Sequence, residues 1–392
     1  MRFAMKTMPQ LTTETLRFSL TDIATPSFVI DEYQLKKNLE LIQEVRNQTN
    51  CKILLALKAF SSFSVFDLMR PYLDGCTSSS LHEAKLAKES FKKDVHIYSP
   101  AFKDTEFDEI ASYSNHIVFN SPSQLSHFSE KLGDHPHMEV GVRLNPEFSQ
   151  TKTPLHDPCI PGSRFGITKE NLDRVDWSKI DGVLIHALSG LYVDHFENLL
   201  AISEKKFGHL FSKLKWVNFG GGHMICASNY DRARLCTLIN AFKAKYGVQV
   251  ILEPGHGMVV NTGYLVTSVI DIVSNGCEIA ILDCAASTHM PDILEIPLRA
   301  DIVNAELPGV LPYTYRLGSN TCLSGDILGD YSFANPLKPG DKIAFCDMAA
   351  YTIVKSSTFN GVQHPDIAIW RLNNTLEIVR RFGYEEFKNR LS

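Results

Sequence analysis

The chain contains 392 residues, of which 44% are hydrophobic and 21% are charged, and its formal net charge is −5 at pH 7. This composition is ordinary for globular proteins and excludes the disordered, collagen-like and disulfide-scaffold classes. The charges form neither a long Lys/Arg run nor a basic stripe with interleaved aromatic residues, so nothing indicates nucleic-acid binding. A chain of this length exceeds the usual size of one hydrophobic core, and we expect two domains.

Short apolar or β-branched runs alternate with longer amphipathic segments through the first two thirds of the chain. This alternation is typical of parallel βα units. The expected strands cover residues 53–57, 75–78, 95–98, 116–119, 139–144, 182–186, 216–219 and 248–252. The clearest helical segments between them cover residues 81–90, 123–132, 198–214 and 230–246. The eight runs predict an α/β fold built on a (β/α)8 barrel, whose usual length is about 250 residues.

The sequence changes character after Asn261. Strand-like runs at residues 264–273, 278–283 and 341–345 follow one another without long helices between them, and turn-forming residues separate them. This pattern predicts a C-terminal antiparallel β domain. We therefore expect three segments. They are residues 1–40, which contribute a strand to the β domain, residues 41–260, which form the barrel, and residues 261–392, which form the β domain.

The cysteines and the N-terminal residues indicate the cellular compartment of the protein. Nine cysteines are present and no Cys-x-x-Cys pair occurs, so zinc ribbons are unsupported and we expect no metal site. Several of the cysteines lie in apolar runs, which indicates free thiols in a reducing compartment. The first 25 residues lack the apolar core and cleavage site of a leader, and no apolar run approaches about 18 residues. We therefore expect a cytoplasmic protein without a membrane segment.

Four polar features follow the expected barrel strands, at the carboxyl ends where such barrels collect their functional groups. Each has an ordinary structural alternative. The lysine could reach out to solvent, the histidine could be a satisfied core residue, the glycines could form a tight turn, and the glutamate could be a loop carboxylate. In chain order the features are Lys58, His186, the triplet Gly220-Gly221-Gly222, and Glu253.

One cofactor would use all four features together. A desolvated lysine loses proton affinity, as an amine that forms a Schiff base must. Consecutive glycines let main-chain N–H groups approach a phosphate, which in these barrels often lies after the seventh and eighth strands. A flat histidine can stack on a ring, and a carboxylate can hold a pyridine nitrogen. The combination predicts pyridoxal 5'-phosphate as the cofactor.

Several segments resemble the fold-type-III pyridoxal-phosphate decarboxylases, which include the ornithine, arginine, diaminopimelate and carboxynorspermidine decarboxylases. The resemblance spans nearly the whole chain and is strongest to the carboxynorspermidine group. It implies a carboxy-lyase of polyamine biosynthesis that converts carboxynorspermidine or carboxyspermidine to norspermidine or spermidine. The segments that carry it are residues 55–58 (LALK), 98–103 (YSPAFK), 216–223 (WVNFGGGH), 289–292 (HMPD), 318–326 (GSNTCLSGD) and 358–361 (TFNG).

The resemblance also implies roles for individual residues. Catalysis would rest on Lys58, which forms the Schiff base, on His186, and on Cys322 as general acid. Contacts to the cofactor would come from Lys58, His186, Ser189, Gly221, Gly222, Glu253 and Tyr351. Contacts to the substrate would come from His256, Asp292 and Asp326. Because Cys322 would be supplied by the other subunit, the resemblance implies a homodimer with shared active sites.

Two residues refine the expected class. Leu323 follows Cys322, where ornithine and diaminopimelate decarboxylases usually place an acid, and this agrees with the carboxynorspermidine group. Alanine racemases place an arginine at the pyridine nitrogen. Glu253 instead keeps that nitrogen protonated, which favours loss of CO2 over racemisation.

The chain departs from the carboxynorspermidine group near the substrate. Ser189-Gly190 stands where that group typically has Cys-Glu, and His256 stands where it typically has Glu. Two possible partners for substrate ammonium groups are therefore missing, and each charged hydrogen bond would contribute about 1.5–3 kcal/mol. A decarboxylase of ornithine, lysine, arginine or a diaminopimelate-like amino acid stays open as an alternative. So do an amino-acid racemase and a non-catalytic cofactor-binding barrel.

Overall fold

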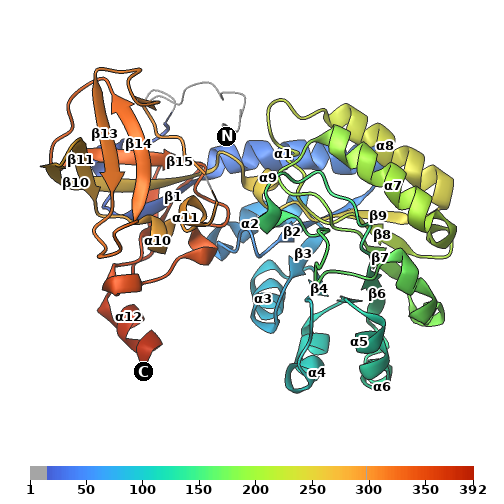
Figure 1. Cartoon of the computed structure of the whole chain (residues 1–392). Coiled ribbons are helices and arrows are strands. Elements are labelled where there is room, and N and C mark those ends of the chain that lie inside the picture. The colour runs from blue at the N-terminus through green and yellow to red at the C-terminus, as the bar shows by residue number, and fades with distance from the viewer. Residues whose placement is uncertain (1–15, 297) are drawn as a thin grey trace. The chain divides into compact units, whose positions relative to one another are not determined.

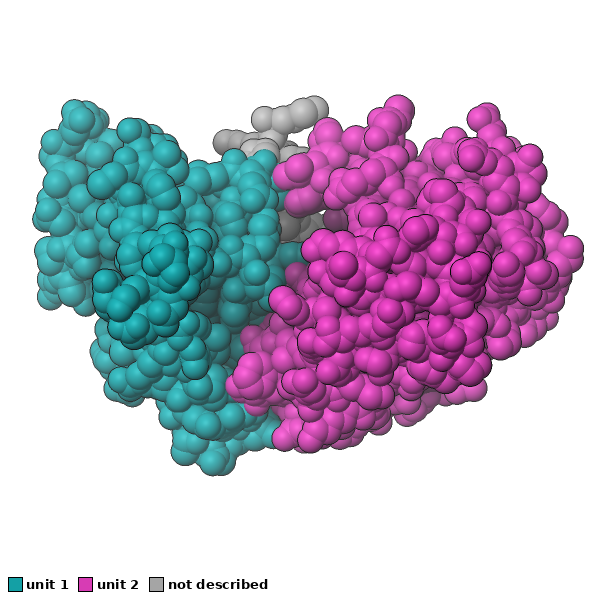
Figure 2. Space-filling view, turned by 90° about the horizontal axis from the view of Figure 1, so that it is seen from below, with its two compact units in different colours: residues 1–35, 261–392 teal, residues 36–260 magenta. Residues whose placement is uncertain are grey.

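The computed structural model describes residues 16–296 and 298–392, and the structural statements below refer to these residues. The first fifteen residues, which begin the expected 1–40 segment and the stretch screened for a leader, lie outside them. The chain forms two compact units, which Figure 2 colours separately. One unit is Lys36–Val260, and the other combines the chain up to Leu35 with Asn261–Ser392.

Eight parallel strands close a barrel in the Lys36–Val260 unit (Figure 1). Each strand pairs with its neighbours in chain order, and the last returns to the first, where Lys52 lies opposite Ile251. The barrel predicted from the alternating pattern is therefore confirmed. Its strands are β2 (Lys52–Ala56), β3 (Gly75–Ser78), β4 (Asp94–Tyr98), β5 (His116–Phe119), β6 (Glu139–Arg143), β7 (Gly182–Leu184), β8 (Trp216–Asn218) and β9 (Gln249–Leu252).

Helices between the strands surround the barrel (Figure 1). In α7 (Val193–Phe211), the buried Phe196, Leu200 and Phe207 recur at helical spacing and form the apolar face. The helix α8 (Arg232–Tyr246) begins with an aspartate side-chain cap and ends at a left-handed glycine, as helices commonly do. The other helices are α1 (Glu32–Thr49), α2 (Phe66–Met69), α3 (Leu81–Leu86), α4 (Asp104–Tyr113), α5 (Pro122–His127), α6 (Ser129–Gly133) and α9 (His256–Val259).

Aromatic rings fill the amino-terminal end of the barrel. A Cβ atom on Gly182 would lie 2.0 Å from the Trp216 ring and one on Gly141 2.4 Å from it, so the two glycines make room for the indole. His96 and His116 stack beside it with ring centroids 3.7 Å apart. Such packing is typical of these barrels, in which the functional groups lie at the opposite, carboxyl ends of the strands.

The other unit is built on a nine-stranded sheet. Its strands are β1 (Ser27–Asp31), β10 (Gly263–Ser274), β11 (Glu278–Leu282), β12 (Ala305–Glu306), β13 (Tyr313–Gly318), β14 (Ile327–Phe333), β15 (Lys342–Cys346), β16 (Asp366–Trp370) and β17 (Leu376–Arg380). Their order is β12-β14-β13-β11-β10-β1-β16-β17, and β15 pairs with β10.

The predicted β domain is confirmed, but its sheet is mixed and not purely antiparallel. β1 runs parallel to β16, and β11 runs parallel to β13. Short hairpins force neighbouring strands to be antiparallel, whereas partners that are distant in the chain are free of that constraint. β1 pairs with a strand more than 300 residues later, so no hairpin sets its direction.

Both faces of this sheet are packed. Along β10, Leu265 belongs to one buried cluster, and the adjacent Tyr264 and Val266 belong to the other, because successive side chains point to opposite faces. The short helices of this unit are α10 (Ala286–His289), α11 (Asp292–Glu295) and α12 (Tyr384–Leu391). Within residues 16–296 and 298–392, no helix has both the length and the apolar character needed to span a bilayer.

Candidate active site

Lys58 follows β2 at the carboxyl end of the barrel. Water reaches its side chain, yet the protein atoms around the amine desolvate it. This desolvation lowers the pKa of Lys58. The Glu253 carboxylate opposes the effect, and the Arg143 guanidinium adds to it. Lys58 therefore loses its proton more readily than an ordinary lysine, and the neutral amine is the form of lysine that acts as a nucleophile.

Glu253 follows β9 and is held by side chains from two neighbouring strands. Nδ2 of Asn218, the last residue of β8, donates to Oε1 of Glu253 at 2.7 Å. The side chain of Thr77 in β3 also forms a hydrogen bond to this carboxylate. Burial raises the pKa of Glu253, and the hydrogen bonds and the charge of Lys58 partly offset this rise. The carboxylate therefore has a fixed position at the mouth of the barrel.

Neither Asn218 nor Thr77 was among the predicted site residues. The available signal for Asn218 was an amide in an otherwise apolar run that ends one residue before the glycine triplet. Its hydrogen bond to Glu253 joins β8 to the segment after β9, and it follows from the pairing of these two adjacent strands.

His186 lies beyond β7 and is oriented by the glycine triplet. The Gly221 N–H donates to Nδ1 of His186 at 3.0 Å, so the proton of the neutral ring lies on Nε2. Burial lowers the pKa of His186 well below its usual value, and the charges of Lys58 and Arg143 lower it further. A neutral imidazole with a fixed plane therefore stands at the barrel mouth.

The glycine triplet is a close-fitting cradle. A Cβ atom on Gly221 would lie 2.4 Å from the main-chain oxygen of Glu253. Gly222 has a left-handed φ of 87°, and a Cβ there would lie 2.1 Å from the main-chain oxygen of Leu188. In the described part of the chain, neither the Gly222 N–H nor the Ser189 hydroxyl has a hydrogen-bond partner. These two groups, adjacent in space, are available to an anion.

Two further charged residues accompany the predicted ones. Arg143, at the end of β6, has its guanidinium 4.8 Å from the Tyr98 ring centroid and 4.5 Å from that of Phe165. It donates to the main-chain oxygen of His186 at 3.0 Å. Glu83, in the first turn of α3, has its pKa raised by burial, and the charge of Lys58 lowers it in part. Both therefore contribute to the electrostatic environment of the lysine.

The predicted substrate residue His256 is the first residue of α9 and is half-buried. The preceding Gly255 packs against the segment that follows β2, since a Cβ on it would lie 2.5 Å from Cβ of Ala59. The structure thus brings together, at one end of the barrel, seven of the predicted residues: Lys58, His186, Ser189, Gly221, Gly222, Glu253 and His256.

Cys322 and Asp326 lie in the other unit, in the turn between β13 and β14. Cys322 is exposed, and its main-chain N–H donates to Oδ1 of Asn360 at 2.8 Å. Asp326 is only 2% exposed, and its carboxylate accepts hydrogen bonds from Ala286 N, Ser287 N, Ser287 Oγ and Thr321 Oγ1. A substrate contact for Asp326 stays a prediction, and the observed carboxylate is already surrounded by protein donors.

Tyr351 and Asp292 also lie in this unit. Tyr351 has a left-handed φ of 60° in the segment after β15, which is uncommon for a bulky residue and is typical of functional positions. Asp292, at the start of α11, accepts a hydrogen bond from Nζ of Lys355 at 2.6 Å. Its carboxylate is therefore paired with a protein cation.

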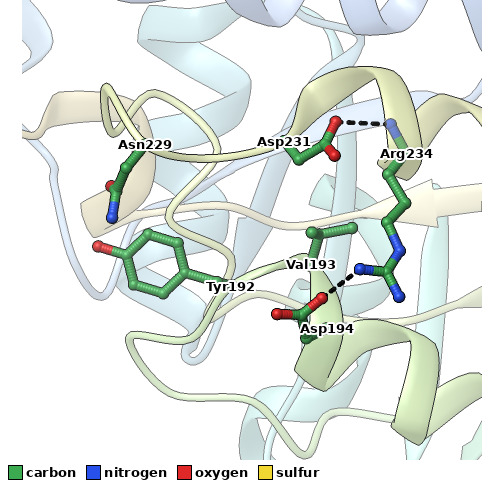
Figure 3. A pocket seen from close by; sticks show the side chains of 6 residues that line it. All are labelled: Tyr192, Val193, Asp194, Asn229, Asp231 and Arg234. Atoms are coloured by element: carbon green, nitrogen blue, oxygen red, sulfur yellow. Dashed lines mark hydrogen bonds and ion pairs between the residues drawn. The ribbon is translucent and has the colours of Figure 1, made fainter.

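A separate cavity of about 350 Å³ lies where α7 and α8 begin (Figure 3). Arg234 forms ion pairs with Asp194 and Glu197, and its main-chain N–H donates to Asp231 at 2.9 Å. Arg234 thus binds three carboxylates, two of them through its guanidinium group. The lining residues are Tyr192, Val193, Asp194, Asn229, Asp231 and Arg234, which include no lysine, histidine or cysteine. The cavity therefore lacks the amine that Lys58 supplies to the barrel mouth.

The sequence profile of the family described as "Pyridoxal-dependent decarboxylase, C-terminal sheet domain" matches residues 27–349. The chain belongs to the pyridoxal-dependent decarboxylases. This decarboxylase is 42% identical to a carboxynorspermidine/carboxyspermidine decarboxylase of Campylobacter jejuni over 379 residues, which cover 94% of this chain and 98% of that protein. It is 38% identical to a carboxyaminopropylagmatine decarboxylase of Synechocystis, over 95% of this chain and 96% of that protein.

A solved structure is similarly close. The crystal structure of the Campylobacter jejuni carboxynorspermidine decarboxylase complexed with norspermidine superposes with a TM-score of 0.87 and 41% identity. The match covers 94% of this decarboxylase and the whole of that chain (100%). The family membership and the barrel-plus-sheet fold predicted from the sequence are therefore confirmed.

Proposed function

We propose that this decarboxylase removes CO2 from carboxynorspermidine or carboxyspermidine to give norspermidine or spermidine, with pyridoxal phosphate as its cofactor. The observation that carries the proposal is the 42% identity to the Campylobacter jejuni protein over nearly the full length of both chains. The residues at the barrel mouth support it, because they supply the groups that this chemistry needs.

The barrel mouth fits pyridoxal phosphate. The free N–H of Gly222 and the Ser189 hydroxyl suit its phosphate, and a side chain at position 221 or 222 would collide with main-chain atoms. The Gly221 N–H already donates to His186. The role of this glycine is therefore to leave space in the loop, because it has no side chain. Glu253 suits the pyridine nitrogen and Lys58 the aldehyde. Tyr351 is assigned to the phosphate because the sequence around it resembles that of the fold-type-III decarboxylases.

Bound pyridoxal phosphate supplies an aldehyde that joins an amine and a conjugated ring that accepts electrons as CO2 leaves. The protein's residues prepare this chemistry. Desolvation lowers the pKa of Lys58, so Nζ loses its proton more readily than the amine of an ordinary lysine. The Glu253 carboxylate, whose position Asn218 fixes, would hold a proton at the pyridine nitrogen of the cofactor. The Glu253 carboxylate is in place before the reaction begins, so little reorganisation is needed.

Two other residues complete the proposal. His186 offers the face of a neutral ring in a plane set by its hydrogen bond from Gly221. Cys322 donates a proton from Sγ to the substrate carbon that has lost CO2. A Lys58→Ala protein that still bound the cofactor covalently and turned over would contradict this assignment.

We further propose a homodimer in which Cys322 serves the barrel of the partner subunit. The exposed apolar side chains near it, Leu323 at 43% and Phe359 at 46%, suit an interface. Co-expression of Lys58→Ala and Cys322→Ala chains tests the proposal. Mixed dimers would contain one intact site and restore about a quarter of the wild-type activity. No recovery above that of the separate variants would contradict shared sites.

The identity of the distal group of the substrate is the open part of the proposal. Ser189-Gly190 and His256 replace carboxylates typical of the carboxynorspermidine group, and Asp292 is paired with Lys355. The 38% identity to a carboxyaminopropylagmatine decarboxylase favours a second candidate substrate, one that ends in a guanidinium group. Other basic amino acids remain alternatives.

CO2 release on a substrate panel tests both candidates. The panel contains carboxynorspermidine, carboxyspermidine, carboxyaminopropylagmatine, ornithine, lysine, arginine and meso-diaminopimelate. We expect the carboxypolyamines to give kcat/KM at least about tenfold above the others, a difference of about 1.4 kcal/mol. Preference for carboxyaminopropylagmatine would select the second candidate. Preference for ornithine, lysine, arginine or meso-diaminopimelate would contradict the polyamine assignment.

We also propose a cytoplasmic location. All nine cysteines are free thiols, as expected of a protein in a reducing compartment.

A further inference from the structure

Cys322 is held by an amide from a distant part of its unit. Its main-chain N–H donates to Oδ1 of Asn360 at 2.8 Å, and the two residues are 38 positions apart. Asn360 is the middle residue of the 3-10 turn η10 (Phe359–Gly361). The hydrogen bond therefore connects the turn between β13 and β14 to η10, at the residue proposed to deliver the proton.

Asn360 has an uncommon backbone conformation. Its φ of 57° and ψ of 11° lie in the left-handed region, which asparagine tolerates better than most residues with a side chain. Gly361 follows with a φ of 72°. The Gly361 N–H donates to the main-chain oxygen of Thr358, which is buried, at 2.9 Å. This hydrogen bond closes the turn and fixes the backbone of Asn360, and with it the position of the side-chain amide.

A second anchor acts on the residue before Cys322. Thr321 Oγ1 donates to Oδ2 of the buried Asp326 at 2.5 Å. Burial raises the pKa of Asp326, but its hydrogen bonds, first those of Ser287 and Thr321, outweigh burial and lower the pKa below its usual value. The carboxylate therefore remains an ionised acceptor. Asp326 fixes Thr321 from one side, and Asn360 fixes Cys322 from the other.

We propose that Asn360 is a positioning residue for Cys322. This inference rests on the proposed role of Cys322 as proton donor. A fixed N–H and a fixed preceding residue together hold the peptide plane and the N–Cα bond of Cys322, and this restricts the region that Sγ can reach. Loss of the Asn360 amide would free the peptide plane of Cys322 and displace Sγ without removing a contact to the substrate.

The step affected is the transfer of one proton. The S–H bond of Cys322 breaks, a C–H bond forms at the carbon that has lost CO2, and the thiolate regains a proton from water. Such transfers depend strongly on geometry, and a displacement of about 1 Å can cost about a hundredfold in rate. A defect in positioning should therefore lower kcat more than it raises KM.

Three variants of the full-length holoenzyme test the inference. Asn360→Gly removes the acceptor and permits the left-handed backbone. Asn360→Asp keeps an acceptor oxygen at the same place. Asn374→Gly is the matched control, because Asn374 is also left-handed, with a φ of 61°, and lies in the same unit in the turn between β16 and β17. Its side chain accepts a hydrogen bond from Arg17 and not from the Cys322 turn.

We expect Asn360→Gly to lower kcat about tenfold or more, with KM changed less than about twofold. Its solvent deuterium isotope effect on kcat should rise, and amide hydrogen exchange of the peptide around Cys322 should accelerate about tenfold. Asn360→Asp should recover most of kcat, and Asn374→Gly should match the wild type in all four measurements.

Three results would overturn the inference. Unchanged kcat in Asn360→Gly, in a protein whose Cys322→Ala variant is impaired, would overturn it while leaving the role of Cys322 intact. A raised KM with unchanged kcat would show that Asn360 acts on substrate binding and not on Cys322. Full activity of Cys322→Ala would overturn both the inference and the proposed role of the cysteine.

Discussion

The main-chain N–H of Gly221 lies 3.0 Å from Nδ1 of His186 and donates a hydrogen bond to it. The loop proposed to receive the phosphate and the ring proposed to cover the cofactor are therefore one unit. A change in either should alter the other, and cofactor affinity is the quantity that reports both.

Gly221→Ala should weaken binding of pyridoxal phosphate. The new Cβ would lie 2.4 Å from the main-chain oxygen of Glu253, so the loop must shift and the bond to His186 must lengthen. Strain and a lost hydrogen bond together should cost about 1.4–3 kcal/mol, or about ten- to a hundredfold in Kd. Absorbance titration of the cofactor-free protein measures this. Gly133→Ala, with nothing within 4 Å of the new Cβ, is the control, and an equal Kd in both would contradict the expectation.

Lys58 should react as an amine of lowered pKa. Desolvation lowers the pKa of Lys58 from 10.5, so its neutral form is present at lower pH than that of an ordinary lysine. The Arg143 cation contributes to the lowering, and Arg143→Met should therefore raise the midpoint. The pH dependence of modification by an amine-reactive reagent, followed by mass spectrometry of the Lys58 peptide, measures it. A Lys58 midpoint at or above 10.5 in the cofactor-free wild type would refute this prediction.

His96 should make the barrel less stable in acid. Burial lowers the pKa of His96 well below 6.5, so the folded state binds its proton less readily than the unfolded state. The free energy of unfolding is therefore highest above about pH 6.5. It falls as the pH is lowered, by up to about 1.4 kcal/mol per pH unit. In the described residues, neither ring nitrogen of His96 has a hydrogen-bond partner, so His96→Phe keeps a flat ring and removes the titration. Urea unfolding at pH 7 and pH 5 should show a smaller pH effect in the variant, and equal pH effects would argue against this role.

Gly182 and Trp216 should behave as a coupled pair. Gly182→Ala places a Cβ 2.0 Å from the indole and should destabilise the fold by about 2–4 kcal/mol. Trp216→Leu should cost about 3–5 kcal/mol by opening a cavity. Trp216→Leu removes the ring atoms with which the new Cβ of Gly182→Ala would clash. The double variant should therefore lose less free energy of unfolding than the two single variants added together, by at least about 1 kcal/mol. Denaturant unfolding of the four proteins measures this, and strict additivity would show that the two residues do not share one space.

Local pattern was enough to place the barrel strands. Each predicted run begins or ends within about two residues of the observed strand, because apolar periodicity and flanking turns are encoded in neighbouring residues. The strand ends also predicted the positions of Lys58, His186 and Glu253, because all strands of a parallel barrel have their carboxyl ends at the same rim. The strands β12, β13, β14, β16 and β17 were not predicted. β12 has only two residues and β17 carries exposed polar residues, so the apolar pattern of these two is weak.

The partners of the site residues could not be read in this way. Asn218 meets Glu253 and Gly221 meets His186 across 35 residues each, and these pairings exist only once β7, β8 and β9 lie side by side. Asp326 was predicted to contact substrate, but in the fold its carboxylate is surrounded by donors from its own turn and from the start of α10. Residue identity and spacing thus specify which chemical groups reach the rim of the barrel. Long-range packing determines which of those groups are already engaged and which remain free to bind a ligand.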